Sequence, residues 1–468
     1  MRRVKIFIII LIITLNTVNI GVLNASAFSP GFELHSRAAL MVNLDTNLTV
    51  FKLNEFERIY PASTIKIMTA LIVLDNVSDL NQFVKVTNNM NHGFGKDWNY
   101  IGAGVADFVI GQENLTYLDC LYALMIHSAC DAANILADNI AGSIPAFVDM
   151  MNKKAAELNL VNTHFVNPHG LHDKGQYSCA WDLFQIAKYA YEKHPRFVEI
   201  VRATEYTFPA NSRHTEGIAL RNTNRLLQRN LSDGTSNPFY YEFARGIKTG
   251  SIDYYFDVDT EVMEPGNFNL VSIAVKNDFT YLLVTLGAPF YRLDDPSRRC
   301  FNVYDDHVRL FDWAFDTLEY KTVLSVNNIL RQVTVINGTE DRVQLRPAAD
   351  YSTMLPKNLD ATAIEYAVTL FQNEIEAPIA KGEILGFVEL KLNDEVLIGS
   401  RINLVAYADV GLSPQEQIRE RVSGILDSTW FRVGVAIIAA LILFVVVLRI
   451  INSVRRKKRR RGGRRFNR

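Results

Sequence analysis

The stretch P-A-S-T-I-K-I-M-T-A-L-I-V-L at residues 61–74 decides how the rest of this sequence is interpreted. Its apolar pattern predicts a helix over 63–74. Ser63 and Lys66 are three residues apart, so their side chains face the same way on that helix. A serine hydroxyl is a poor nucleophile unless a base takes its proton, and a lysine can be that base when burial or a neighbouring positive charge lowers its pKa. The positive end of the helix dipole would favour an anion that develops beside it.

By itself this pair is a weak signal, because a chain of this length holds on the order of two such pairs by chance. The ordinary interpretation is a serine that caps a helix and a lysine exposed to solvent. A second motif is rarer: Lys248-Thr249-Gly250 has a chance expectation of roughly 0.1 per chain. A lysine on an edge strand can hold a substrate carboxylate, and the glycine lets a substrate backbone approach closely. A third motif, H-S-A-C-D-A at 127–132, lies at a junction between two predicted helices.

Together the three motifs resemble the S-x-x-K, S-x-N and K-T-G set of penicillin-binding proteins and serine β-lactamases, in the same order and with wide separations. Three further stretches are similar to one family in that group, the D-alanyl-D-alanine carboxypeptidases (low-molecular-weight penicillin-binding proteins, serine peptidase family S11). They are N-T-H-F-V-N-P-H-G-L at 162–171, N-T-N-R-L-L at 222–227 and A-P-I-A-K-G-E at 377–383. The last is similar to that family's C-terminal β-domain. The resemblance extends over about residues 28–410.

The resemblance implies a function in bacterial cell-wall (peptidoglycan) biosynthesis and cell shape. A serine-type D-Ala-D-Ala carboxypeptidase, a hydrolase, would trim the terminal D-alanine from peptidoglycan stem peptides, and β-lactams would inhibit it. Ser63 would be the nucleophile, Lys66 its base and Ser128 a proton relay to the leaving amine. Backbone N–H groups, one of them that of Ser63, would form the oxyanion hole. Four residues would bind substrate: Cys130, Lys248, Thr249 and Gly250. No cofactor and no metal is implied.

The sequence departs from the family pattern at two places. Cys130 stands where the S-x-N motif has asparagine, and a thiol donates and accepts hydrogen bonds only weakly. Losing one such bond costs roughly 0.5–1.5 kcal/mol, which is about tenfold in rate rather than abolition. Cys130 as an independent nucleophile has no evident base partner in the sequence. The second departure is an acidic stretch at 257–267, expected to be irregular and to reshape one wall of the cleft.

Several alternatives have to be weighed against a carboxypeptidase. A class A β-lactamase needs a glutamate in an E-x-x-L-N pattern, and Ala155 occupies that position. Cys130 also leaves open a weakly active or inactive penicillin-binding scaffold. Whether water or an amine accepts the acyl group, as in a DD-transpeptidase, is not decided by these residues. Three histidines of one loop are expected to make local hydrogen bonds rather than to bind a metal: His164, His169 and His172.

The two chain ends predict export and membrane anchoring. A basic start, an apolar run at 6–15 and A-S-A at 25–27 are typical of a signal peptide over residues 1–27. Near the other end, a transmembrane helix is predicted over 431–451, after a polar stem at 411–430. The tail at 452–468 carries ten Lys and Arg. The positive-inside rule therefore places the tail in the cytoplasm and the catalytic domain outside a single-pass cell membrane protein.

The charge distribution argues against nucleic acid as a partner. All 50 acidic residues but only 34 of the 49 basic ones lie between Phe28 and Phe431, which leaves this part with a net charge of about −16. A body with this charge does not grip an acidic polymer by bulk attraction. The basic tail follows a membrane span directly, so it fits anionic lipid headgroups better than nucleic acid. The four cysteines match no disulfide or zinc spacing and are expected to be isolated core thiols.

The hydrophobic patterns predict two extracytoplasmic domains. Residues 28–316 read as an α+β domain of the β-lactamase/transpeptidase-like kind, an antiparallel sheet flanked by helices. Its predicted strands are at 38–44, 49–53, 270–275 and 281–286, and its helices at 63–74, 115–127, 131–141, 144–158 and 181–192. Its first and last strands should pair, and K-N-D at 276–278 should form a hairpin turn. Residues 321–410 read as a small all-β domain.

Overall fold

The structure is a computed structural model. It describes residues 30–94, 104–257, 262–292, 298–392, 395–397 and 399–462. The predicted signal peptide therefore lies outside the described residues. The chain divides into two compact units, one made of residues 1–321 with 353–360 and one of 322–352 with 361–468.

The centre of the first unit is a five-stranded antiparallel sheet with the strand order β2-β1-β9-β8-β5. Its strands are β1 (Ala38–Asn43), β2 (Leu48–Leu53), β5 (Ala244–Ser251), β8 (Asn267–Lys276) and β9 (Phe279–Pro289). The first strand pairs with the last, as the sequence predicts. The β8–β9 hairpin turns where expected, with two successive residues of positive φ that suit the right-handed twist of the strands.

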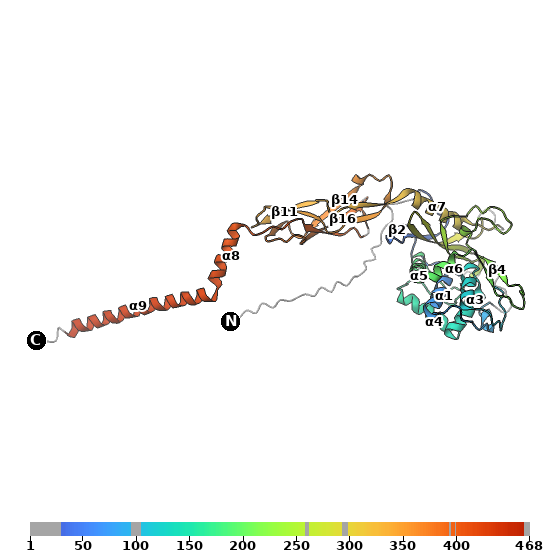
Figure 1. Cartoon of the computed structure of the whole chain (residues 1–468), viewed down its shortest axis with the longest axis horizontal. Coiled ribbons are helices and arrows are strands. Elements are labelled where there is room, and N and C mark those ends of the chain that lie inside the picture. The colour runs from blue at the N-terminus through green and yellow to red at the C-terminus, as the bar shows by residue number, and fades with distance from the viewer. Residues whose placement is uncertain are drawn as a thin grey trace. The chain divides into compact units, whose positions relative to one another are not determined.

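Both faces of this sheet are covered, which explains the unbroken apolar run of β1. Leu40 and Val42 point into one hydrophobic core, and Met41, between them, points into the other. The first core is covered by helices α1 to α6 (Figure 1). The second is covered by α7. These seven helices are α1 (Lys66–Asn76), α2 (Tyr117–Ile126), α3 (Cys130–Ala141), α4 (Ile144–Glu157), α5 (Ala180–Lys193), α6 (Pro195–Arg202) and α7 (Asn302–Thr317).

The structure refines two local expectations. The helix predicted over 63–74 begins with a 3-10 turn, Ala62–Ile65, and only from Lys66 is it α-helical. Thr64 stabilises that tighter turn, because its Oγ1 donates to the Pro61 carbonyl at 2.7 Å. The acidic stretch after the K-T-G motif is also more regular than expected. Where it is described, strands β6 (Tyr254–Asp257) and β7 (Val262–Pro265) pair antiparallel as a hairpin. The remaining strands of this unit include a second short hairpin, β3 (Glu205–Phe208) with β4 (Ile218–Arg221).

The second unit is rich in strands, as predicted for its part of the sequence. A seven-stranded sheet has the order β14-β16-β18-β12-β11-β15, with β17 paired to β16. Its strands are β11 (Arg331–Ile336), β12 (Arg342–Pro347), β14 (Ile364–Leu370), β15 (Glu374–Glu376), β16 (Ile384–Leu392), β17 (Glu395–Val396) and β18 (Ile402–Ala406). Strands β10 (Leu318–Leu324) and β13 (Tyr351–Pro356), each of which belongs partly to the first unit, form a separate two-stranded sheet.

Two helices end the described chain. The polar α8 (Pro414–Asp427) starts with Ser413, whose hydroxyl accepts from the Glu416 N–H, and has no buried residue. It is followed by α9 (Thr429–Gly462), of which residues 429–457 are long and apolar enough to cross a membrane. The expected fold class, an α+β domain, an all-β domain and one apolar C-terminal helix, is thus confirmed.

Candidate active site

The serine–lysine pair lies at the start of α1, between the helices and the open edge of the five-stranded sheet. Lys66 Nζ donates to Ser63 Oγ at 2.9 Å. Lys66 is fully buried, whereas Ser63 is partly open to solvent. An exposed lysine beside a capping serine, the ordinary interpretation of this spacing, is therefore ruled out. The hydroxyl is accessible to a substrate while its hydrogen-bond partner is shielded from water.

The surroundings of the Lys66 amine suit a general base. Besides Ser63, Nζ contacts the Cys130 thiol at 3.5 Å and the backbone carbonyl of His169. Burial lowers the pKa of Lys66 below its ordinary value, and the neighbouring Cys130 and Asp131 only partly oppose this shift. A lower pKa increases the share of neutral amine near neutral pH, which is the form that can accept the serine proton.

The H-S-A-C-D-A motif lies at the junction between α2 and α3. Ser128 has a positive φ of 65°, which is unusual for a residue with a side chain. Cys130 is the first residue of α3 and is only 2 % exposed. Its sulfur contacts Lys66, a basic neighbour that is not evident from the sequence. Burial nevertheless raises the pKa of Cys130, which keeps it a neutral thiol and argues against a role as nucleophile.

The K-T-G motif lies on β5, the edge strand of the sheet, as expected. Lys248 and Thr249 are almost fully buried, and burial lowers the pKa of Lys248 well below its usual value, with the Lys66 charge adding to the effect. A buried cation is costly unless it meets an anion. Gly250 has a different neighbour from the one expected: a Cβ there would lie 2.8 Å from the Pro61 carbonyl oxygen. This glycine therefore lets β5 pack against the serine turn itself.

Two contacts at the site were not anticipated from the sequence. The loop at 162–171 packs along α1, because Thr69 Oγ1 donates to the Pro168 carbonyl at 2.7 Å and Lys66 donates to the next carbonyl, that of His169. Thr223, in the N-T-N-R-L-L stretch, has its hydroxyl 2.6 Å from that of Thr249. The two family-like stretches therefore contact the catalytic motifs directly, the first at Lys66 and the second at Thr249.

The histidines of the 162–171 loop and its continuation make local contacts. His164 Nδ1 lies 2.8 Å from the Gly175 carbonyl oxygen. His169 Nδ1 accepts from the Leu171 N–H at 3.2 Å, and burial lowers the pKa of its ring to about 3. This ring is therefore neutral. Local hydrogen bonding, the expected role, is confirmed for these two residues.

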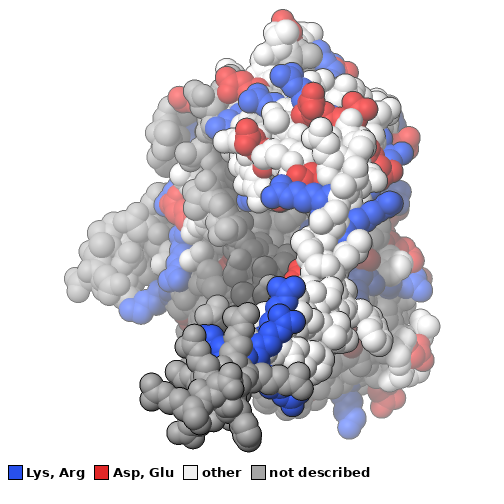
Figure 2. All heavy atoms as spheres, turned by 90° about the vertical axis from the view of Figure 1, so that its left-hand side faces the viewer, with Lys and Arg blue, Asp and Glu red and all other residues white. Residues whose placement is uncertain are grey.

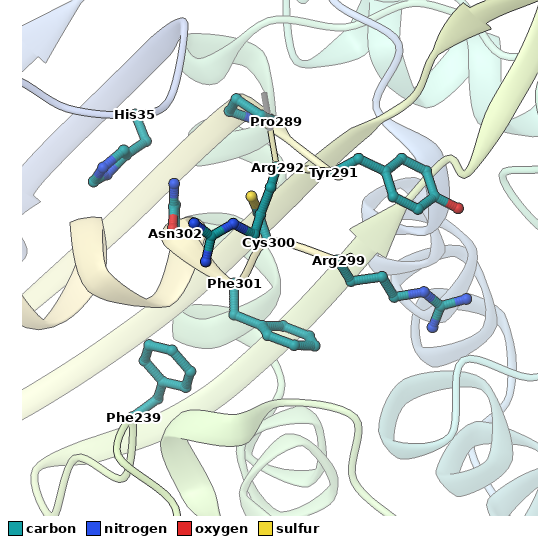
Figure 3. A pocket seen from close by; sticks show the side chains of 9 residues that line it. All are labelled: His35, Phe239, Pro289, Tyr291, Arg292, Arg299, Cys300, Phe301 and Asn302. Atoms are coloured by element: carbon teal, nitrogen blue, oxygen red, sulfur yellow. The ribbon is translucent and has the colours of Figure 1, made fainter. Parts of the chain in front are cut away.

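A hollow of about 660 Å³ lies away from the three motifs. It is formed by the end of β9 and the start of α7, and Figure 3 shows the rings of Phe239 and Phe301 near each other on its wall. None of the residues that line it belongs to the motifs, and Arg299, at its edge, is 3.7 Å from Asp253. The chemistry indicated by the sequence therefore belongs to the Ser63 site and not to this hollow.

Comparisons with known proteins agree with the geometry. A family model described as D-alanyl-D-alanine carboxypeptidase matches residues 24–289, and one described as penicillin-binding protein 5, C-terminal domain, matches residues 318–411. The D-alanyl-D-alanine carboxypeptidase DacF of Bacillus subtilis is 28% identical over 372 residues, which cover 78% of this chain and 84% of the relative. DacC of Escherichia coli is 27% identical over 372 residues, covering 77% and 81%.

Solved structures show the same fold. The DacD carboxypeptidase of Francisella tularensis superimposes with a TM-score of 0.61 at 19% identity, over 83% of this chain and 96% of its own. Penicillin-binding protein 5 of Haemophilus influenzae gives a TM-score of 0.54 at 23% identity, over 81% and 98%. The first family model alone spans more than half of the chain, and the serine–lysine pair is in place. The chain belongs to the D-alanyl-D-alanine carboxypeptidase family, the serine hydrolases of peptidase family S11.

Proposed function

We propose that this protein is a serine-type carboxypeptidase that removes the terminal D-alanine from peptidoglycan stem peptides ending in D-Ala-D-Ala. The observation that carries the proposal is the 2.9 Å contact between Ser63 Oγ and the fully buried amine of Lys66. The amine takes the serine proton, and the oxygen attacks the carbonyl carbon of the penultimate D-alanine. Backbone N–H groups, one of them that of Ser63, stabilise the oxyanion.

The other two motifs complete the reaction. Ser128 relays a proton to the amine of the leaving D-alanine, so that the C–N bond breaks and the acyl group remains on Ser63. Lys248 and Thr249 bind the terminal carboxylate, which places an anion beside the buried Lys248. Cys130 lines the substrate amide next to them. Water then hydrolyses the ester and frees the serine.

The same cleft would be acylated by β-lactams, whose ring carbonyl takes the place of the peptide carbonyl. A scaffold without chemistry is not favoured, because the Ser63–Lys66 contact and the lowered pKa of Lys66 are both present. The replacement of asparagine by Cys130 leaves these two features intact. A transpeptidase would share every step up to the acyl-enzyme and would differ only in the acceptor.

The protein is proposed to be anchored in the cell membrane by α9, with its catalytic domain outside. This assigns residues 1–27 to a signal peptide, 28–316 to the peptidase domain and 321–410 to the β-rich domain. The stem (411–430), span (431–451) and cytoplasmic tail (452–468) follow. No nucleic acid partner is proposed, because the part between Phe28 and Phe431 carries a net charge of about −16. In the upper part of Figure 2, acidic side chains lie among the basic ones.

Intact-mass analysis after incubation with a penicillin, together with D-alanine release from a muropeptide that ends in D-Ala-D-Ala, tests this function. We expect one adduct and free D-alanine for the wild type, neither for Ser63→Ala, and both for the control Ser232→Ala, which changes an exposed loop serine. An undiminished adduct on Ser63→Ala, or no D-alanine from the wild type, would contradict the proposal.

A further inference from the structure

Asp131, the residue after Cys130, is a buried carboxylate whose described hydrogen bonds all come from backbone N–H groups. It is 2 % exposed. Both of its oxygens lie 3.0 Å from the Ala106 nitrogen, and Oδ1 accepts from the Ala132 N–H at 2.9 Å. Burial raises the pKa of Asp131, and these donors, with the Phe108 N–H, lower it. An ionised carboxylate only accepts hydrogen bonds, so this set of donors matches the charged form.

The carboxylate attaches the segment 104–108 to the Ser128–Cys130 junction. Beside the bonds to Ala106, the Cys130 N–H donates to the Gly104 carbonyl at 2.8 Å. Gly104 is in contact with the junction, because a Cβ there would lie in van der Waals range of the Ser128 carbonyl oxygen, at 3.5 Å. The segment therefore packs directly against the backbone of the proposed proton relay.

The junction needs such support. The positive φ of Ser128 is unfavourable for a residue with a side chain. Such a conformation persists only where the surroundings impose it. Gly104 and Ala106 are bonded to Cys130 and Asp131, which follow Ser128 by two and three residues, so these bonds restrict the backbone on the C-terminal side of Ser128.

Asp131 also contributes negative charge to a site that holds two buried lysines. Its charge raises the pKa of Lys66 and so opposes the effect of burial. The other described groups that act on the Lys66 amine are the Cys130 thiol from α3, Ser63 from the same turn and the charge of Lys248 from β5. The 162–171 loop adds the His169 carbonyl and the His169 ring, which interacts electrostatically with Lys66 and whose pKa of about 3 keeps it neutral. Among the described groups near this amine, Asp131 is the carboxylate that acts on it.

We propose that Asp131 is a positioning residue for the reaction: it holds the 104–108 segment against the Ser128–Cys130 junction and sets the charge balance around Lys66. The inference rests on the proposed function, because it assigns Asp131 a part in the same site. Asp131 touches neither substrate nor reacting atoms and acts through Ser128 and Lys66.

Penicillin acylation of Asp131→Asn, measured as a rate across pH, tests the proposal. The plateau rate is expected to fall by about tenfold to a hundredfold, since hydrogen bonds to a charged group contribute about 1.5–3 kcal/mol. The acid limb of the profile, which is the range where the rate falls as the pH drops, is expected to move to lower pH. Acylation needs neutral Lys66, and without the nearby negative charge the amine loses its proton at a lower pH.

Asp306→Asn is the matched control. Asp306 is also a fully buried carboxylate that accepts two backbone N–H bonds, from His35 and Ser36, but it lies on α7 at the other face of the sheet. It should lower the melting temperature without shifting the acid limb. Hydrogen exchange followed by mass spectrometry should show faster exchange in peptides covering 104–108 for Asp131→Asn and unchanged exchange there for Asp306→Asn.

Gly104→Val separates the two parts of the inference and replaces Asp131→Asn if that variant does not fold. Its side chain adds volume beside the Ser128–Cys130 junction, so the plateau rate should fall. It leaves the Asp131 charge unchanged, so the acid limb should stay in place. An unchanged plateau in Gly104→Val, or an Asp131→Asn profile that matches Asp306→Asn, would overturn the inference. A wild type that is itself inert would instead refute the proposed function, so the two failures are distinguishable.

Discussion

Replacing Cys130 with asparagine tests the one motif position at which this chain departs from its family. The thiol accepts from Lys66 Nζ at 3.5 Å and is 2 % exposed. An asparagine side chain extends one atom farther from the backbone than a cysteine side chain, and its amide offers both a strong acceptor and two donors. In Cys130→Asn the amide oxygen can accept from the ammonium form of Lys66, and the NH₂ group can donate to a substrate carbonyl.

The size of the effect follows from the hydrogen bonds involved. One additional bond to a substrate amide contributes about 0.5–1.5 kcal/mol, which is a rate increase of up to about tenfold. The bond to Lys66 acts in the opposite direction at low pH. It stabilises the ammonium and raises the pKa of the base, so the acid limb of the rate profile moves to higher pH. Cys130→Asn should therefore keep or raise the plateau rate while narrowing the active range on its acid side.

Cys130→Ala should cost little, because Lys66 keeps its contacts with Ser63 and His169. The assay is D-alanine release across pH for wild type, both Cys130 variants and Ser63→Ala. Cys300→Ala serves as the control for loss of a buried thiol outside the site. Melting temperatures report whether asparagine overpacks the position, which costs about 1–3 kcal/mol where a core cannot adjust.

Two results would refute this reasoning. Activity retained in Ser63→Ala but lost in Cys130→Ala would make the thiol the nucleophile. A fall of a hundredfold or more in Cys130→Ala, with Ser63→Ala also inactive, would show that the thiol is part of the proton pathway. In the second case the 3.5 Å contact with Lys66 would be a functional bond and not a tolerated replacement.

Three further outcomes are expected. Lys66→Ala should slow penicillin acylation by at least about a hundredfold, since a general base contributes 10²–10⁴-fold. In the wild type the rate should fall as the pH drops through the pKa of Lys66, which burial places below the usual 10.5. A rate that does not depend on pH would contradict this. Thr223→Val removes the 2.6 Å contact with Thr249 and should raise KM several-fold more than it lowers kcat, measured with a D-Ala-D-Ala peptide. A chain truncated after Asp427 should be secreted free; recovery of that chain in the membrane fraction would contradict anchoring by α9.

The sequence was sufficient to predict the fold because its signals are local and repeated. Alternating and continuous apolar runs mark the strands, and the K-N-D turn marks the β8–β9 hairpin. The pairing of the first strand with the last followed from the order of elements. Helices α6 and α7 were missed although α7 carries a regular apolar stripe: Val303, Leu310, Phe311 and Ala314. Pro195 is the first residue of α6, a position that proline favours. The short turn before it made α6 hard to separate from the preceding helix in the sequence.

The site was predictable only in part, because motifs name side chains and not their environment. The His169 carbonyl that accepts from Lys66 is a backbone group, and every residue type has one. The identity of residue 169 therefore does not predict this contact. Likewise Thr223 is one threonine among many until β5 brings Thr249 within 2.6 Å. The acidic composition of the 257–267 stretch predicts irregular structure. Strands β6 and β7 nevertheless pair through their backbones, and composition is a poor guide to such pairing.

The feature that turns a common tetrapeptide pattern into a reactive pair is burial, and burial is not a local property. A serine and a lysine three residues apart occur by chance in most chains of this length, and in most of them the lysine extends into water with an ordinary pKa. Here the amine is covered by α3, by the 162–171 loop and by β5, which are separated from it by 64 to 182 positions in the chain. Each of the three carries one of the family-like patterns. The patterns therefore predict the chemistry because they mark the segments that enclose Lys66. Altering any of the three segments should change the burial and the pKa of Lys66 even though Lys66 itself is not mutated.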